Sequence, residues 1–523
     1  MKKRTVVIIS VVALILLGIA GWNIYGWWLK HKLERYKADL VAQGEKLTLR
    51  ELIADHRVPE FNSADVFNRS TALVRQSGVL RSNAPGAMRM IAPGRAIVGS
   101  RQPLLIDKEP WMSKTPVTNT WAELADDLAQ SQEGIELVHE IIAHPDLDFH
   151  LDYNAGAMLL LPHISALKQS AQVLSAAAML DLHNGKPASA AKHIRAKLAI
   201  SKGMRNEPLV ISQLVRIAIL TISLGPTWEL LQSPDVSEAD LKLIQSDFAE
   251  QDFIVPMQHA FEMERAMGSS TIHHYREQGG IYDMFGSSGG GAPSTNFADL
   301  MEERAKRSFS PESIRKTSNE LLWQSALSYE DELLHLQGIT ALIEELRAGA
   351  TNKPLAEVCS NAFLRVKADG KGDDDDVFWN QSNGGDELSL KTLRQMFSAT
   401  GRSVWRSVTK VRTIETGRVL VISAIAIKRY QLPSGNLPKT LDALVPEFLP
   451  APPRDPVDGK PLRYHPNPDG RYLLYSVGEN GIDDGGDASP ATVDSKARLS
   501  ILRGRDMVWP QPATPDEIPA QNP

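Results

Sequence analysis

The sequence predicts a mainly α-helical protein with an N-terminal transmembrane helix, a body of α-helical hairpins and a small C-terminal α+β domain. The chain begins with a long uncharged run, and its middle has helical periodicity with little alternation. Near the C-terminus, two short alternating segments flank a Pro-Asp-Gly turn. We therefore divide the chain into an anchor and stalk (1–45), a helical body (46–350), a connector (351–410), an α+β domain (411–505) and a disordered Pro-rich tail (506–523).

The anchor is expected at residues 5–29, which contain no charged side chain. At about 1.5 Å per residue, this run is long enough to cross a hydrocarbon core of about 30 Å. Basic residues precede it, and an aromatic belt closes its far end at Trp22, Tyr25, Trp27 and Trp28. We expect a single-pass signal-anchor in a bacterial inner membrane, with the N-terminus in the cytoplasm and the bulk in the periplasm. A cleaved signal peptide is disfavoured, because the run is longer than an ordinary apolar h-region.

Composition excludes several classes of protein. Lys and Arg number 57 against 63 Asp and Glu, and no basic run interleaves with aromatic residues, so nucleic acid is not an expected partner. The single cysteine, Cys359, excludes an intrachain disulfide framework. We expect the inner membrane, through residues 5–29, and an envelope protein of unknown identity as the partners.

The helical body is most regular between residues 159 and 231. Asn184-Gly185 closes one expected helix, and Pro187 suits the first turn of the next. Ser237 with Asp240 resembles a capping box, and Ser310-Pro311 opens a long helix that runs towards residue 346. By contrast, Pro and Gly residues between 85 and 116 predict an irregular segment.

The C-terminal α+β domain follows a helix that Gly435 and Pro438 end. A short helix at 440–445 comes next, then Arg-Asp-Pro at 454–456 and a hairpin around Gly470. The order of these elements over residues 411–494 resembles the soluble domain of the major pseudopilin of type II secretion systems. The whole chain also resembles bacterial membrane-anchored helical proteins with a pseudopilin-like C-terminus. It lacks the Gly-Phe processing site of a true pseudopilin, so we do not expect a pilus subunit.

The pseudopilin resemblance implies a calcium site in the loop after Gly478. Hard cations prefer several oxygen ligands, and the loop offers Asp483, Asp484, Asp487 and Asp494. Asn480 stands where the family usually has Asp, which removes one charge. The alternative is an acidic, solvated turn held by its own hydrogen bonds.

Other polar motifs do not have catalytic spacing. Imidazole and carboxylate groups between residues 259 and 277 are able in principle to bind zinc, at His259, Glu262, His273, His274 and Glu277. No HExxH pattern occurs among them, and solvated helix faces often carry unrelated histidines. The Gly-rich segment 285–294 lacks the Gly-Lys-Ser/Thr ending of a phosphate loop, and the acidic segment 368–376 lacks the order of an EF-hand.

These observations predict a membrane-anchored extracytoplasmic scaffold or interaction protein of the cell envelope, related to secretion by resemblance and without catalysis. An envelope hydrolase with dispersed catalytic residues is the first alternative. A calcium-dependent surface-binding module is the second. A cleft that groups His259, His273 or His274 with carboxylates favours the hydrolase.

Overall fold

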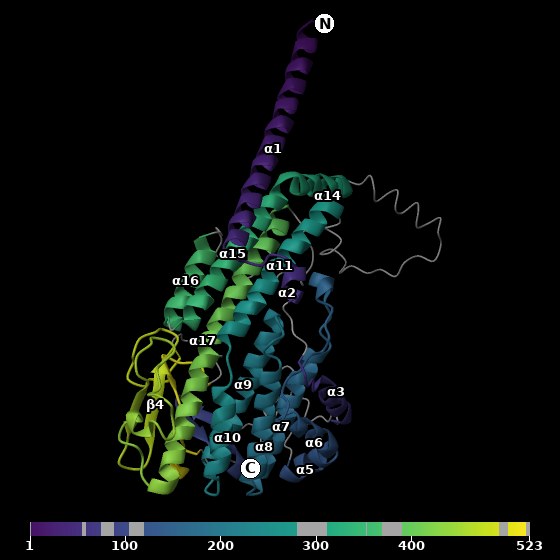
Figure 1. Ribbon diagram of the computed structural model, residues 1–523. Coiled ribbons are helices and arrows are strands. Elements are labelled where there is room, and N and C mark those ends of the chain that lie inside the picture. The colour runs from purple at the N-terminus through teal and green to yellow at the C-terminus, as the bar shows by residue number, and fades with distance from the viewer. Residues whose placement is uncertain are drawn as a thin grey trace.

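The computed structural model describes residues 2–54, 59–74, 88–103, 120–279, 311–351, 353–368, 390–490 and 500–518. It is mainly helical, and two small sheets lie at one end (Figure 1). Helix α1 (Lys2–Ala42) leaves the body as a single rod, and its N-terminal half extends beyond every other element (Figure 1).

The N-terminal half of α1 carries its apolar side chains on the outside. Side chains from Val6 to Ile19 are exposed, and continuous burial against the body begins only near Gly26 and Leu29. Two helices among the described residues are long and apolar enough to cross a membrane, namely α1 and α9 (Val210–Leu231). More than half of the apolar window of α9 is buried inside the protein, which is typical of a core helix. Helix α1 is compatible with a membrane anchor or a signal sequence.

The helical body contains the expected hairpin of α7 (His163–His183) and α8 (Pro187–Gly203). Gly185 turns the chain with a φ of +68°, and Pro187 occupies the first helical turn. Further along the chain, Ser237 caps α10 (Glu238–Ala249) by accepting a hydrogen bond from the amide of Asp240 at 3.0 Å. The remaining elements of this region are α2 (Leu49–Ala54), α3 (Ala64–Leu73), α5 (Trp121–Ala129), α6 (Gln132–Glu140) and η2 (Tyr153–Met158).

The long helix expected to begin at residue 310 is interrupted. It consists of α14 (Pro311–Leu322), a π-helical turn η3 (Trp323–Leu327) and α15 (Ser328–Ala350). Helix α15 packs along α11 (Ile254–Gln278), and α1 packs against both η3 and α15. A π-helical turn often marks a functional position in a helix, and this one lies where the body meets α1.

The connector and the α+β domain share one long helix. Helix α16 (Leu355–Ala368) lies in the expected connector, and α17 (Leu390–Ser434) begins there and ends at Gly435, whose φ is +70°. The hydrophobic core runs through the boundary, because Trp228 of the body and Trp509 of the C-terminal region belong to one buried cluster. The α+β unit is therefore fused to the helical body.

The C-terminal sheet contains the expected hairpin. Strand β3 (Arg463–Pro466) pairs antiparallel with β4 (Tyr472–Val477), which pairs antiparallel with β5 (Asp506–Val508). The short helix also forms, as η5 (Leu441–Leu444), with Leu441 and Leu444 buried.

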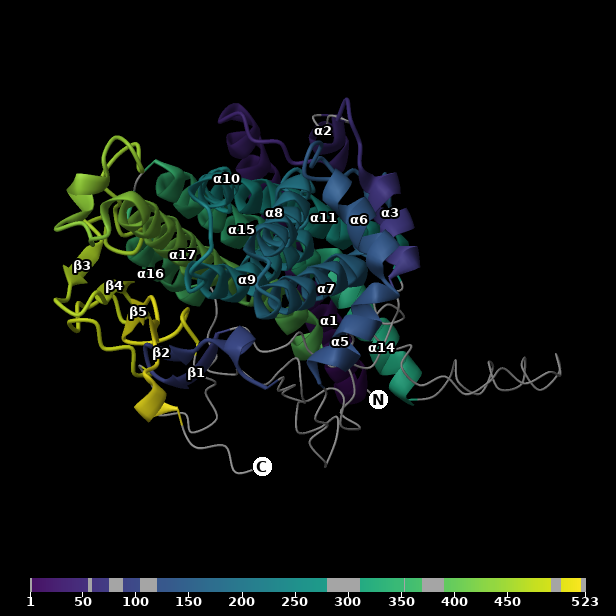
Figure 2. The ribbon, with the colours of Figure 1, turned by 90° about the horizontal axis from the view of Figure 1, so that it is seen from below.

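A second sheet corrects two sequence-based expectations. Strands β1 (Arg89–Ala92) and β2 (Arg95–Ile97) form a hairpin in the segment expected to be irregular, and η1 (Gly99–Arg101) follows. Strand β6 (Gln511–Pro512) pairs in parallel with β2, so this sheet joins distant parts of the chain (Figure 2). The expectation of a disordered tail from residue 506 is thus wrong for residues 506–518, which form β5, β6 and η6 (Pro515–Glu517). Buried Val508 and Trp509 hold this segment in place.

Candidate functional site

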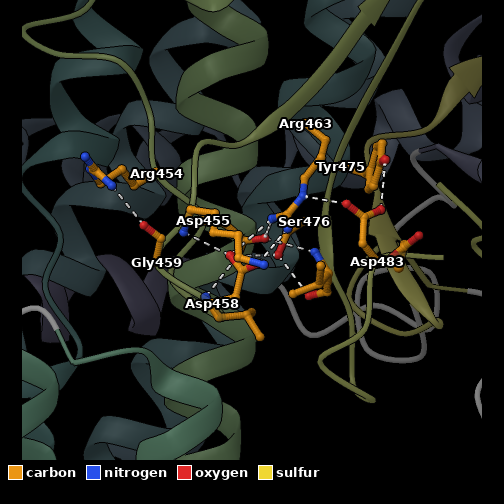
Figure 3. A network of polar contacts seen from close by, with 12 residues as sticks. Arg454, Asp455, Asp458, Gly459, Arg463, Tyr475, Ser476 and Asp483 are labelled. Carbon is orange, nitrogen blue, oxygen red and sulfur yellow. Dashed lines mark hydrogen bonds and ion pairs between the residues drawn. The ribbon is translucent and has the colours of Figure 1, made fainter. Parts of the chain in front are cut away.

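The polar centre of the C-terminal unit is Asp455, whose carboxylate is fully buried beside β4 (Figure 3). It accepts hydrogen bonds from the amide of Val457 at 2.9 Å, the amide of Val477 at 2.9 Å and the hydroxyl of Ser476 at 2.7 Å. Because buried carboxylates need several donors, this set ties the Arg-Asp-Pro segment to the sheet.

Arg463 on β3 connects this centre to the acidic loop (Figure 3). Its guanidinium donates to Asp455 at 2.5 Å, to Asp458 at 2.6 Å and to Asp483 at 3.1 Å. The hydrogen bond to Asp458 and the negative charges around it raise the pKa of Arg463, so this side chain is a permanent cation. One arginine therefore pairs with three carboxylates from two separate segments, the turn at 455–458 and the acidic loop.

The three described aspartates of the expected calcium site have partners within the protein. Asp483 accepts from the hydroxyl of Tyr475 at 3.0 Å as well as from Arg463. Asp484 and Asp487 lie 3.8 and 3.9 Å from the guanidinium of Arg505. Arg463 and Arg505 thus place positive charge at the loop.

Asp506 organises the backbone of the same loop and was not identified from the sequence. Its buried carboxylate accepts from the amides of Asp484 at 3.1 Å, Gly486 at 2.7 Å and Asp487 at 3.2 Å. Sequence reasoning missed it because it stands at the start of the segment assigned to a disordered tail. Its position directly before the apolar residues Met507, Val508 and Trp509 was the local signal.

No group of three or more histidine, cysteine, aspartate or glutamate side chains in the described part of the chain is arranged to hold a metal ion. Asp494, the fourth expected ligand, lies outside the described residues. Because Asp483 already uses both oxygens, a cation at this loop has to compete with Arg463 and Arg505 for carboxylates. Calcium binding stays a prediction.

A second candidate site is a cleft of about 470 Å³ at the end of the stalk. It is lined by Glu45, which follows α1, by His259 and Glu262 of α11, and by Arg347 of α15. Arg347 donates to Glu45 and, at 2.9 Å, to Glu262. Burial opposes ionisation of Glu45, yet hydrogen bonds from Arg347 and Arg265 outweigh it and lower the pKa of the carboxyl.

The histidines of the expected zinc cluster are not brought together. His259 reaches the cleft, whereas His273 and His274 are exposed further along α11 and do not line it. Within the described residues, no hydrogen-bond partner orients the imidazole of His259. The cleft therefore holds an imidazole and two carboxylates, but the carboxylates are committed to arginines.

Two further motifs named from the sequence cannot be placed. The Gly-rich segment 285–294 and the acidic residues 369–376 lie outside the described residues.

Comparison of the chain with protein-family models, with curated proteins and with solved structures finds no match.

Proposed function

We propose that this protein is a membrane-anchored extracytoplasmic scaffold of the cell envelope, which acts through protein contacts and not through catalysis. Helix α1 crosses the inner membrane, and the body stands outside the cytoplasm on the stalk. The C-terminal α+β unit is pseudopilin-like and serves as the presented surface.

The observation that carries the proposal is the buried ion-pair network between the stalk and the body. Lys37 of α1 pairs with Glu332 of α15 at 2.5 Å, and Arg276 of α11 pairs with the same carboxylate at 2.5 Å. Glu332 is fully buried, and Ser269 adds a hydrogen bond at 2.6 Å. A flexible tether needs no such network, because it only has to connect an enzyme to a membrane. A stalk fixed in this way supports a protein whose orientation to the membrane matters.

The position of the α+β unit supports the same function. It lies at the end of the body opposite to the projecting half of α1 (Figure 1). Ile482, in the acidic loop, is 61% exposed. This side chain is therefore the position at which the proposed contact of the loop with a protein partner is tested.

The experiment is photo-crosslinking in intact cells that express the full chain. A photoreactive amino acid replaces Ile482 in one variant and Leu243 in the control, since Leu243 is 45% exposed and lies on α10, outside the acidic loop. A scaffold that presents the acidic loop gives a defined protein adduct from position 482 and none from position 243. Equal adducts from both positions, or none from position 482, contradict this role for the loop.

The envelope hydrolase is the second candidate, and the cleft at the end of the stalk favours it. The cleft groups His259 with the carboxylates of Glu45 and Glu262. Its test compares His259→Ala with His274→Ala in cells that lack the wild-type protein, because His274 is an exposed histidine of the same helix outside the cleft. The scaffold proposal expects both variants to complement alike. Selective loss of function in His259→Ala, with normal protein levels and melting, favours the hydrolase.

A further inference from the structure

Two neighbouring leucines at the end of α14 are exposed. Leu321 is 61% exposed and Leu322 is 40% exposed. Single exposed leucines are common on soluble proteins and need no explanation. These two differ because of what lies beside them.

The turn that follows these leucines contacts the anchor helix directly. The indole nitrogen of Trp22 donates to the hydroxyl of Ser325 at 2.8 Å, and Ser325 bonds back to the carbonyl of Leu322 at 3.3 Å. Gly26 lies so close that a Cβ at this position would overlap the carbonyl of Ser325. The leucines are therefore fixed at the depth of Trp22 and Gly26 along α1.

That depth is the end of the apolar run of α1. Trp27 and Trp28 are exposed there, and the first basic residue after the run is Lys30. Tryptophan rings prefer the boundary between hydrocarbon and headgroups. Helix α14 crosses the direction of α1 at this level, so it lies along the plane in which a bilayer surface would stand (Figure 1).

We propose that the end of α14 is a second membrane contact, in which Leu321 and Leu322 enter the interfacial layer of the lipid beside the anchor. The partner is the bilayer itself, because the exposed leucines directly precede the turn that contacts α1 at the end of its apolar run. A helix that lies in the interface buries its apolar side chains at the boundary of headgroups and acyl chains. A single membrane-spanning helix leaves the tilt of the body relative to the membrane free, whereas two membrane contacts fix it. This inference rests on the proposed anchor.

The test uses the full chain in vesicles of phosphatidylethanolamine and phosphatidylglycerol. In a Cys359→Ala background, single cysteines at positions 321, 15 and 243 carry an environment-sensitive fluorophore, and some lipids carry a nitroxide quencher near the headgroup or in the acyl chain. Position 15 reports the exposed apolar part of α1, and position 243 reports an exposed leucine on α10 in the membrane-distal half (Figure 1). Unchanged melting of each labelled variant establishes that it is folded.

The proposal expects quenching at positions 15 and 321 and none at position 243. Headgroup-level nitroxides should quench position 321 several-fold more than acyl-chain nitroxides, with the opposite order at position 15. Quenching at position 15 with none at position 321 overturns the membrane contact of α14 and leaves the anchor intact. No quenching at position 15 overturns the anchor itself.

Discussion

Glu45, three residues beyond the end of α1, accepts a hydrogen bond at 2.6 Å from Nη2 of Arg265, which lies 220 positions later on α11. The Arg265 side chain has no exposed surface, and it also donates to Thr340 at 3.0 Å and to the carbonyl of Lys46 at 3.1 Å. Arg347 holds the other side of the same carboxylate. The chain is thus clamped between α11 and α15 at the point where it leaves the stalk.

Glu45→Ala should therefore destabilise the full chain. The substitution leaves the buried guanidinium of Arg265 without its carboxylate, and removal of one member of a buried pair typically costs about 3–5 kcal/mol. The measurement is the melting temperature in detergent. Glu34→Ala is the matched control, since Glu34 is a mostly exposed carboxylate on α1, the helix that precedes Glu45, and it should melt like the wild type. Equal melting of the two variants would contradict the clamp.

Lys197→Met should stabilise the protein at neutral pH. Lys197 is 0% exposed and donates to Ser175 at 2.7 Å, and no carboxylate among the described residues pairs with it. Burial lowers the pKa of its amine from 10.5 to about 7. At about 1.4 kcal/mol per pH unit, this shift corresponds to a cost on the order of 5 kcal/mol, which methionine of similar volume removes.

The same lysine sets a pH dependence. Between pH 7 and 10 the unfolded chain holds a proton on this amine that the folded chain does not, so its contribution makes stability rise with pH. Below about pH 7 both states are protonated and the contribution is constant. The advantage of Lys197→Met should therefore be largest at or below pH 7 and shrink towards pH 10. Lys192→Met, on the exposed face of α8, is the control, and identical pH profiles for the two variants would refute this assignment.

Asp455→Ala should loosen the C-terminal unit. The substitution removes the acceptor of two buried amides and one of the anions around Arg463. Each buried donor that is left without a hydrogen-bond partner costs about 1–3 kcal/mol of stability. Hydrogen exchange at Val457 and Val477 should accelerate, because Asp455 accepts from both amides. Asp469→Ala alters an exposed aspartate in the hairpin turn and should leave those amides protected. Unchanged exchange in Asp455→Ala would show that the carboxylate does not hold the sheet.

Calcium should raise the melting temperature of the full chain. If calcium binds the loop, the stabilisation at a hundredfold excess over Kd is about 2.7 kcal/mol. Asp484→Ala and Asp487→Ala should reduce it. Arg505→Ala should increase it, because Arg505 lies within 3.9 Å of both carboxylates and competes for them. If the melting temperature is the same with calcium and with chelator in the wild type and in all three variants, the calcium site is refuted. The loop is then an acidic turn neutralised by arginines.

Local signals in the sequence predicted the local elements. Pro187 and Ser237 mark helix starts because a proline or a capping oxygen acts within one turn. The same is true of the hairpin at Gly470, where the turn residue and the flanking alternation are adjacent.

The clamps and the second sheet depend on contacts that no local pattern encodes. Strand β6 pairs with β2, and Arg95 bonds to Gln511 across 416 positions. The proline content of the last residues is typical of disorder, but buried Trp509 and pairing at a sheet edge override it. Glu45 likewise gains its meaning only from Arg265 and Arg347, so the sequence alone offered no reason to single it out.

The most direct test of the central claim, an anchor in α1 with the body outside the cytoplasm, is a pair of reporter fusions at Pro523. One reporter is active only outside the cytoplasm and the other only inside. We expect activity from the first alone, with the fusion protein retained in the membrane fraction after washing with high salt and alkali. Activity from the cytoplasmic reporter alone would contradict the topology, and release of the fusion protein from the membrane would contradict the anchor.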